Sequence, residues 1–91
     1  MLPVPNLASS IVDVAGTSVS IRSLSRMEVL HIRTFEDREE EAEVFILSRS
    51  TGQTEDEAKA FLEGHDSDTA EVLLNAVFVL SGLREAAGSK A

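Results

Sequence analysis

The most uniformly apolar stretch of the chain covers residues 68–82, DTAEVLLNAVFVLSG. Its few polar positions are Asp68, Thr69, Glu71, Asn75 and Ser81. A helix that is apolar on nearly all sides is normally buried on most of them, and this stretch is shorter than the roughly 20 apolar residues that cross a bilayer. The pattern therefore predicts a helix over residues 68–81 that is covered by protein, either by this chain or by a partner.

Residues 26–50 contain neither Gly nor Pro and are predicted to form one long helix. The acidic run EDREEE (36–41) divides its apolar positions into two groups, and like charges at this spacing each cost a few tenths of a kcal/mol. The positions that nevertheless share one face are Ile32, Phe35, Ala42 and Ile46. We therefore expect a single bent helix rather than a true break. The acidic stretch 36–43 is either a solvated helix face or a docking strip for a basic partner.

Each predicted helix opens with a capping pair and is followed by a glycine. The pairs are Ser25 with Glu28, Thr54 with Glu57 and Asp68 with Glu71, and the glycines are Gly52, Gly64 and Gly82. The middle pair predicts a short helix over residues 55–63. Gly82 can end the last helix in a left-handed conformation that lets Leu83 fold back on Phe78.

Alternation of apolar and polar residues predicts a β-hairpin near the start of the chain. IVDV (11–14) and SVSIR (18–22) flank Ala15, Gly16 and Thr17, which we read as a three-residue turn. Two strands alone are unstable in water, so the hairpin needs a helix or another subunit against its apolar face. Its edges remain open to the addition of a further strand.

Together these elements predict a mainly α fold, in which an N-terminal β-hairpin precedes a small bundle of three helices at about 26–50, 55–63 and 68–81. We expect one domain over residues 11–83, a flexible arm over residues 1–10 and a frayed tail over residues 84–91. The last helix is expected to bury one side against Met27, Leu30, Phe45 and Phe61.

Composition and charge narrow the classes of function. The 91 residues carry a formal charge of −8, from 16 acidic and 8 basic side chains, so nucleic acid and anionic membrane surfaces are not expected as partners. There is no cysteine, hence no disulfide framework and no thiol nucleophile. The first ten residues lack the basic start and apolar run of a secretion signal, so we expect a cytoplasmic protein.

The densest group of possible metal ligands is Glu63, His65, Asp66 and Asp68. Its spacing matches neither HExxH nor the calcium loop, and Asp66 and Asp68 are better explained as acids that cap the last helix. His31 is expected to be a half-exposed structural residue. No Gly-rich phosphate loop and no nucleophile motif is present, so we expect neither a cofactor nor an enzyme.

The order of the elements resembles a known family. IRSLSRMEVL (21–30) follows the hairpin, an acidic helix leads to QTEDEAKAFLE (53–63), and the last helix closes on LSGL (80–83). Over residues 11–83 this resembles the small tail assembly chaperones of long-tailed bacteriophages. The segment FILSRSTGQ (45–53) departs from that family because it has no Pro before the turn.

The resemblance implies a non-enzymatic protein of the host cytoplasm that binds the tape measure protein, and also the tail tube protein, and is absent from the finished virion. Such proteins often have a longer form made by ribosomal frameshifting, and a chain that ends soon after LSGL suits the short form. Two alternatives stay open. One is a small structural or head–tail connector subunit that forms a permanent oligomer, and the other is a metal-dependent enzyme built on the residue 63–68 group.

We expect client binding of the helix-in-groove kind, together with self-association, on the side of the last helix that the chain leaves uncovered. The candidate partner-binding residues are Val44, Leu47, Val72, Val79 and Leu83.

Overall fold

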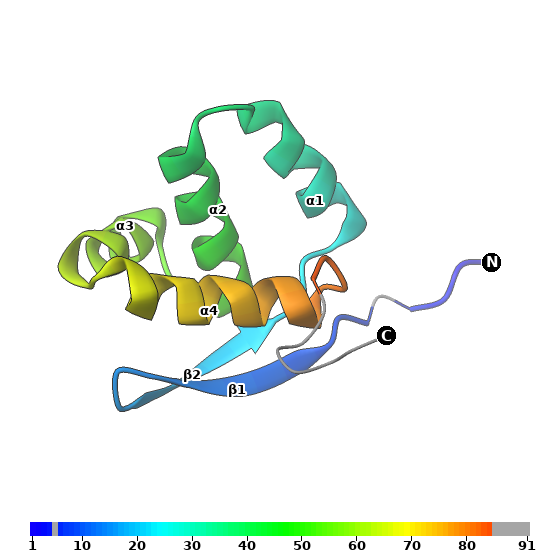
Figure 1. The fold of residues 1–91 in the computed structure, drawn as a ribbon. Helices are drawn as coiled ribbons and strands as arrows, with labels where there is room; N and C mark the ends of the chain where they lie inside the picture. The colour runs from blue at the N-terminus through cyan, green and yellow to red at the C-terminus, as the bar shows by residue number, and fades with distance from the viewer. Residues whose placement is uncertain (5, 85–91) are drawn as a thin grey trace.

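The computed structural model describes residues 1–4 and 6–84, and it places a two-stranded antiparallel hairpin before a group of helices (Figure 1). The elements are β1 (Ser9–Val14), β2 (Thr17–Arg22), α1 (Arg26–Ile32), the short 3₁₀ helix η1 (Arg33–Phe35), α2 (Glu39–Thr51), α3 (Glu55–Gly64) and α4 (Ser67–Leu80). A mainly α fold with an N-terminal hairpin is therefore correct. The predicted number of three helices is wrong, because the 26–50 segment is divided.

The break between α1 and α2 replaces the single bent helix that we expected. Glu36 adopts a positive φ of 55°, which a continuous helix does not allow. Arg38 then folds back, and its guanidinium donates to the carbonyls of Thr34 at 3.0 Å and Phe35 at 3.2 Å. These bonds satisfy helix-end carbonyls that have no partner within the helix. The acidic run thus contains the end of one helix and the start of another, rather than a bend in a single helix.

The hairpin starts earlier and turns more tightly than predicted. β1 begins at Ser9, and the carbonyl of Ala8 accepts a bond from the Ser23 N–H at 2.8 Å, so residues 8–10 are not part of a flexible arm. Val14 pairs directly with Thr17, which leaves a two-residue turn. Its residues Ala15 and Gly16 have φ values of 50° and 80°, as two-residue hairpin turns with a matching twist require.

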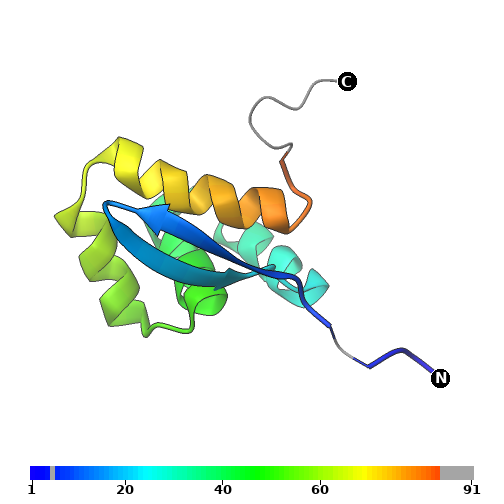
Figure 2. The same ribbon diagram turned by 90° about the horizontal axis from the view of Figure 1, so that it is seen from below.

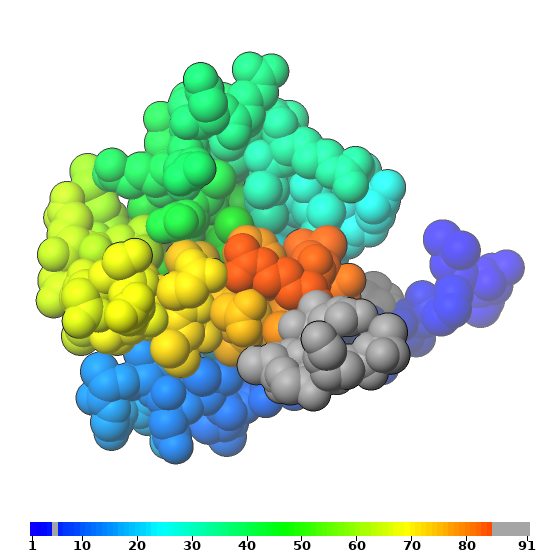
Figure 3. Space-filling model, viewed as in Figure 1, coloured from blue at the N-terminus to red at the C-terminus, as the bar shows by residue number. Residues whose placement is uncertain are grey.

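The hairpin covers one side of α4 and the helices cover another (Figure 1, Figure 2). Val14 and Ile21 of the hairpin are buried, and so are four residues of α4: Ala70, Leu73, Leu74 and Val77. In the space-filling view a strip of α4 stays visible between these two coverings (Figure 3). The chain itself thus supplies most of the cover that the apolar helix needs.

Two residues expected against α4 lie elsewhere. Met27 is 73% exposed and Leu30 is also exposed, so the prediction that they bury the last helix is wrong. α1 has no buried residue, and only its half-buried Val29 and Ile32 pack against the core. α1 is consequently an outer layer of the domain.

Two of the three predicted helix starts are confirmed. The Ser25 hydroxyl accepts from the Glu28 N–H at 3.2 Å, and the Thr54 hydroxyl accepts from the Glu57 N–H at 3.1 Å; in each case the glutamate accepts in return from the cap residue's N–H. The third is shifted. Asp66, not Asp68, caps α4 and accepts from the Thr69 N–H at 2.9 Å.

The glycines behave differently from one another. Gly52 and Gly82 have positive φ, and the Leu83 N–H donates to the Phe78 carbonyl at 2.8 Å, as predicted. Gly64 instead lies inside α3 and has no positive φ. The α3 helix ends there because His65 turns to an extended conformation.

Candidate functional site

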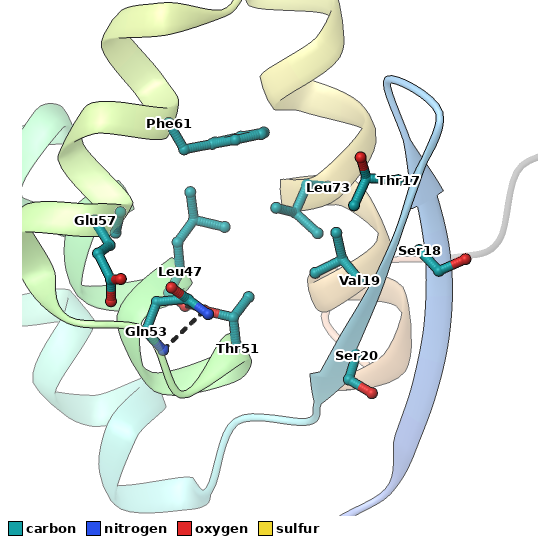
Figure 4. A pocket seen from close by; sticks show the side chains of 11 residues that line it. Thr17, Ser18, Val19, Ser20, Leu47, Thr51, Gln53, Glu57, Phe61 and Leu73 are labelled. Atoms are coloured by element: carbon teal, nitrogen blue, oxygen red, sulfur yellow. Dashed lines mark hydrogen bonds between the residues drawn. The ribbon is translucent and has the colours of Figure 1, made fainter.

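A groove with an apolar floor lies beside β2 and has a volume of about 370 Å³ (Figure 4). We call it the β2 groove. Its apolar lining comes from four elements and consists of Val19, Leu47, Ala58, Phe61 and Leu73. Its polar rim includes Thr17, Thr51, Gln53 and Glu57. In Figure 4 the Phe61 ring lies on one side of the groove and the Val19 and Leu73 side chains lie on the other.

Local structure places these side chains. Gly52, with a φ of 77°, turns the chain sharply from α2 into α3 and so brings Phe61 opposite the hairpin. Thr51 reinforces the turn, since its hydroxyl donates to the Leu47 carbonyl at 2.6 Å and accepts from the Gln53 N–H at 3.3 Å (Figure 4). Ala58 is buried between the larger side chains, and its small size keeps the groove open.

The groove runs along the free edge of β2. In a hairpin with a two-residue turn, the pair next to the turn is hydrogen-bonded, and hydrogen-bonded pairs then recur at every second position. Val14–Thr17 and Val12–Val19 are such pairs, and the Ser23 to Ala8 bond follows the same alternation. The backbone groups of Ser18 and Ser20 therefore point away from β1. Within the described residues no backbone partner meets them, so they can pair with an added strand.

The five predicted partner-binding residues do not form one patch. Leu47 is only 2% exposed and belongs to the core at the floor of the β2 groove, so it is not part of an exposed face. Val44 is half-buried in a different cleft beside Phe45. Val79 lines a second groove of about 300 Å³ between β1 and α4, while Val72 (51% exposed) and Leu83 are accessible.

Sequence reasoning did not identify Val19, Phe61 and Leu73 as site residues. They lie on three different elements, and each one alone looks like an ordinary core position. The only available signal was the unpaired edge of the predicted hairpin, which indicated a strand-binding surface but not the helices that would form its floor.

A bidentate ion pair joins the hairpin to α1. The two terminal nitrogens of Arg22 each lie 2.8 Å from an oxygen of Glu28. The hydrogen bonds from Arg22 lower the pKa of Glu28 to about 2, against the opposing effect of burial. Because Glu28 also closes the cap at Ser25, this one carboxylate fixes the junction between β2 and α1.

A second arginine packs on the exposed side of α4. Arg84 donates to Glu71 at 2.8 Å and to Asn75 at 3.1 Å, and its guanidinium lies 4.5 Å from the Phe78 ring centre. Arg84 is therefore not frayed, and Asn75 is half-buried beneath it. The remainder of the predicted tail, residues 85–91, lies outside the described residues.

The acidic side chains do not gather into a metal site in the part of the chain that the structure describes. His65 packs on Phe61, with ring centres 4.8 Å apart, and Asp66 caps α4, which lowers the pKa of its carboxyl through its bonds to Thr69. His31 packs between two aromatic rings: its ring centre lies 5.2 Å from that of Phe35 and 4.7 Å from that of Phe45. Burial raises the pKa of Glu43, and the nearby carboxylates of Glu39 and Glu71 add to that effect.

Comparisons with protein families, with curated proteins and with solved structures find no match for this chain. None of the helices in the described residues is both long and apolar enough to span a membrane.

Proposed function

We propose that the protein is a non-enzymatic assembly chaperone that holds an extended apolar segment of a larger client in the β2 groove. The client class that its family resemblance suggests is the tape measure protein of a long-tailed bacteriophage, with the tail tube protein as a second client, in the host cytoplasm. The observation that carries the proposal is the position of an apolar groove directly beside an unpaired strand edge.

Strand addition supplies two kinds of contact at this site. The N–H and C=O groups of Ser18 and Ser20 can bond to the client backbone whatever its sequence. Alternate client side chains then enter the groove and contact Val19, Phe61 and Leu73. Burial of apolar client surface contributes about 25 cal/mol per Å². Such a site selects apolar extended segments rather than one particular sequence, as a chaperone requires.

Charge indicates which apolar segments suit the site. The chain carries −8 overall, and the first turn of α3 contributes Glu55, Asp56 and Glu57, of which Glu57 lines the groove. A client segment with Lys or Arg beside its apolar residues is therefore favoured over an acidic one. Its affinity should fall as salt is added, since these charges are exposed.

Co-expression with the tape measure protein of the same phage tests the proposal. Ser20→Pro removes the outward N–H that an added strand needs, while the β1–β2 bonds remain because that N–H does not take part in them. We expect wild type and the matched control Ser20→Ala to co-purify with soluble tape measure protein, and Ser20→Pro to lose it. Equal recovery with all three chains would refute binding at this edge.

The second candidate is a permanent structural subunit, and the observation that favours it is the exposed apolar surface at Leu2, Val4 and Ile11. Mass spectrometry of purified virions distinguishes the two candidates. The chaperone proposal requires the chain to be absent from the finished particle, whereas a structural subunit would be present in stoichiometric amounts.

A further inference from the structure

Residues 1–4 form an exposed apolar arm ahead of β1. Residues 1–4 project away from the body of the protein, beyond the start of the hairpin (Figure 1, Figure 3). Leu2 is 89% exposed and Val4 is 85% exposed. Apolar side chains in such a position gain free energy when another surface covers them.

The order of residues in the arm limits how it can bind. In an extended strand, alternate residues share one face and direct their backbone groups toward one edge. Leu2 and Val4 therefore share both a face and an edge. Positions 3 and 5 belong to the opposite edge, and both are proline, which has no N–H to donate. The arm can join a sheet only through the edge that Leu2 and Val4 provide.

The free edge of β2 accepts such an arm in one orientation. In parallel pairing, a residue opposite Val19 donates to the Ser18 carbonyl and accepts from the Ser20 N–H, and its side chain lies on the same face as Val19. Val19 and Thr17 point into the β2 groove in Figure 4, whereas Ser18 and Ser20 point away from it. Antiparallel pairing would instead turn the bonded residues of the arm to the solvent face. Parallel addition alone combines hydrogen bonding with burial of Leu2 and Val4.

We propose that the arm of a second copy of this chain binds in the β2 groove as a parallel strand, with Val4 opposite Val19 and Leu2 opposite Thr17. Reciprocal exchange of two arms gives a closed dimer. This inference rests on the proposed function in one respect only, that the β2 groove is a binding site. The arm then protects the groove until a client segment displaces it.

The geometry of the hairpin excludes the chain's own arm as the occupant. Ala8 is held in line with β1 by its bond to Ser23. In the proposed register Val4 lies on the far side of β2, two strand spacings or about 9.6 Å from the line of β1, and about 13 Å short of Ala8 along the strands, so the two Cα atoms would be about 16 Å apart. Four fully extended residues span at most about 14 Å, so Val4 and Ala8 of one chain cannot occupy these two positions. The arm must come from another copy.

Analytical ultracentrifugation of the full chain over a range of concentrations tests the proposal. We expect wild type to form a dimer and the double variant Leu2→Asp, Val4→Asp to have a dissociation constant at least about tenfold higher, since two carboxylates would enter an apolar groove. Ile11→Asp is the matched control, because Ile11 is also an exposed apolar residue (68%) but does not line the groove. Its dissociation constant should stay within about twofold of wild type.

The absence of cysteine allows a direct test of register. A Leu2→Cys chain mixed with a Thr17→Cys chain should form a disulfide-linked heterodimer under mild oxidation, because the two positions face each other in the proposed pairing. Leu2→Cys mixed with Ile11→Cys should give no such product above background.

The proposal is overturned if wild type sediments as a monomer at all concentrations, or if the Leu2→Asp, Val4→Asp variant associates as tightly as wild type. Client binding remains a separate result. The arm variant should still co-purify with the tape measure protein, so loss of the dimer with retained client capture supports both proposals. If Ser20→Pro fails to capture the client but wild type forms no dimer, the result supports the proposed function and overturns the arm exchange.

Discussion

The helices α1 and α4 begin with similar caps but are held in place by different forces. α4 has 14 residues, four of them buried, and contacts the hairpin on one side and α2 and α3 on the other. α1 has seven residues and none is buried. Its attachment combines the Arg22–Glu28 pair with half-buried apolar contacts of Val29 and Ile32 and with contacts of His31 to aromatic rings. Full apolar burial therefore stabilises the domain through α4, whereas α1 is held by an ion pair and by partly exposed contacts.

The largest expected effect lies at the centre of α4. Val77 is completely buried, so Val77→Asp places a lone carboxylate in the core and should unfold the domain, at a cost above about 4 kcal/mol. Val72→Asp on the same helix should cost less than about 1 kcal/mol because that residue faces water. Urea denaturation followed by circular dichroism measures both. Equal losses at the two positions would contradict the described orientation of α4.

The next effect concerns the attachment of α1 and depends on pH. The pKa of Glu28 is about 2 in the folded protein and near 4.5 when unfolded. Its carboxylate therefore stabilises the fold fully above about pH 5, and this contribution is lost as pH falls toward 2. Glu28→Gln should lose about 1–2 kcal/mol at pH 7 and flatten the stability profile between pH 5 and 2.

The matched control for that experiment is Glu41→Gln. Glu41 also pairs with an arginine, but at 3.4 Å and with its side chain 59% exposed. Its substitution should change the free energy of unfolding by less than about 0.5 kcal/mol at pH 7. The loss of stability between pH 5 and 2 should be the same as in wild type. If both variants had the same profile, the Arg22–Glu28 pair would have no special role.

Removal of the caps of α1 and α3 sharpens the contrast. Ser25→Ala on α1 and Thr54→Ala on α3 should each cost about 1 kcal/mol through loss of the cap bond. Because α1 has no buried side chain, hydrogen exchange in Ser25→Ala should rise mainly within α1, while α4 keeps its protection. Faster exchange spread evenly over the domain would mean that α1 unfolds only together with the core.

The smallest predicted change is stabilising and lies in the hairpin that covers α4. Ala15 adopts a positive φ of 50°, which Asn tolerates better than Ala. Ala15→Asn should therefore raise the free energy of unfolding by about 0.5 kcal/mol. An unchanged or lower denaturation midpoint would argue against the two-residue turn.

Local signals predicted the parts of the fold that depend on neighbouring residues. The caps at Ser25 and Thr54, the hairpin and the left-handed Gly82 each require only a few adjacent positions, and each is confirmed. The break near Glu36 was missed because it depends on the positive φ of Glu36 and on Arg38 bonding to the carbonyls three and four residues before it, local details that helix periodicity does not contain.

The candidate site was harder to predict than the fold. Exposure of Val72 and Leu83 agrees with the expected uncovered side of α4, yet Leu47 is in the core. The β2 groove depends on Val19, Phe61 and Leu73, which are far apart in the chain and share no motif. Only the tertiary arrangement brings them beside the free strand edge.

Hydrogen exchange at two backbone amides tests the central claim most directly. The N–H groups of Ser18 and Ser20 point away from β1, so in the monomeric arm variant Leu2→Asp, Val4→Asp they should exchange quickly. Addition of the tape measure protein should protect both amides and shift the NMR signals of Phe61 and Leu73, while those of Val79 and Leu83 stay unchanged. Protection or shifts confined to Val79 and Leu83, with Ser18 and Ser20 still exchanging quickly, would contradict binding in the β2 groove.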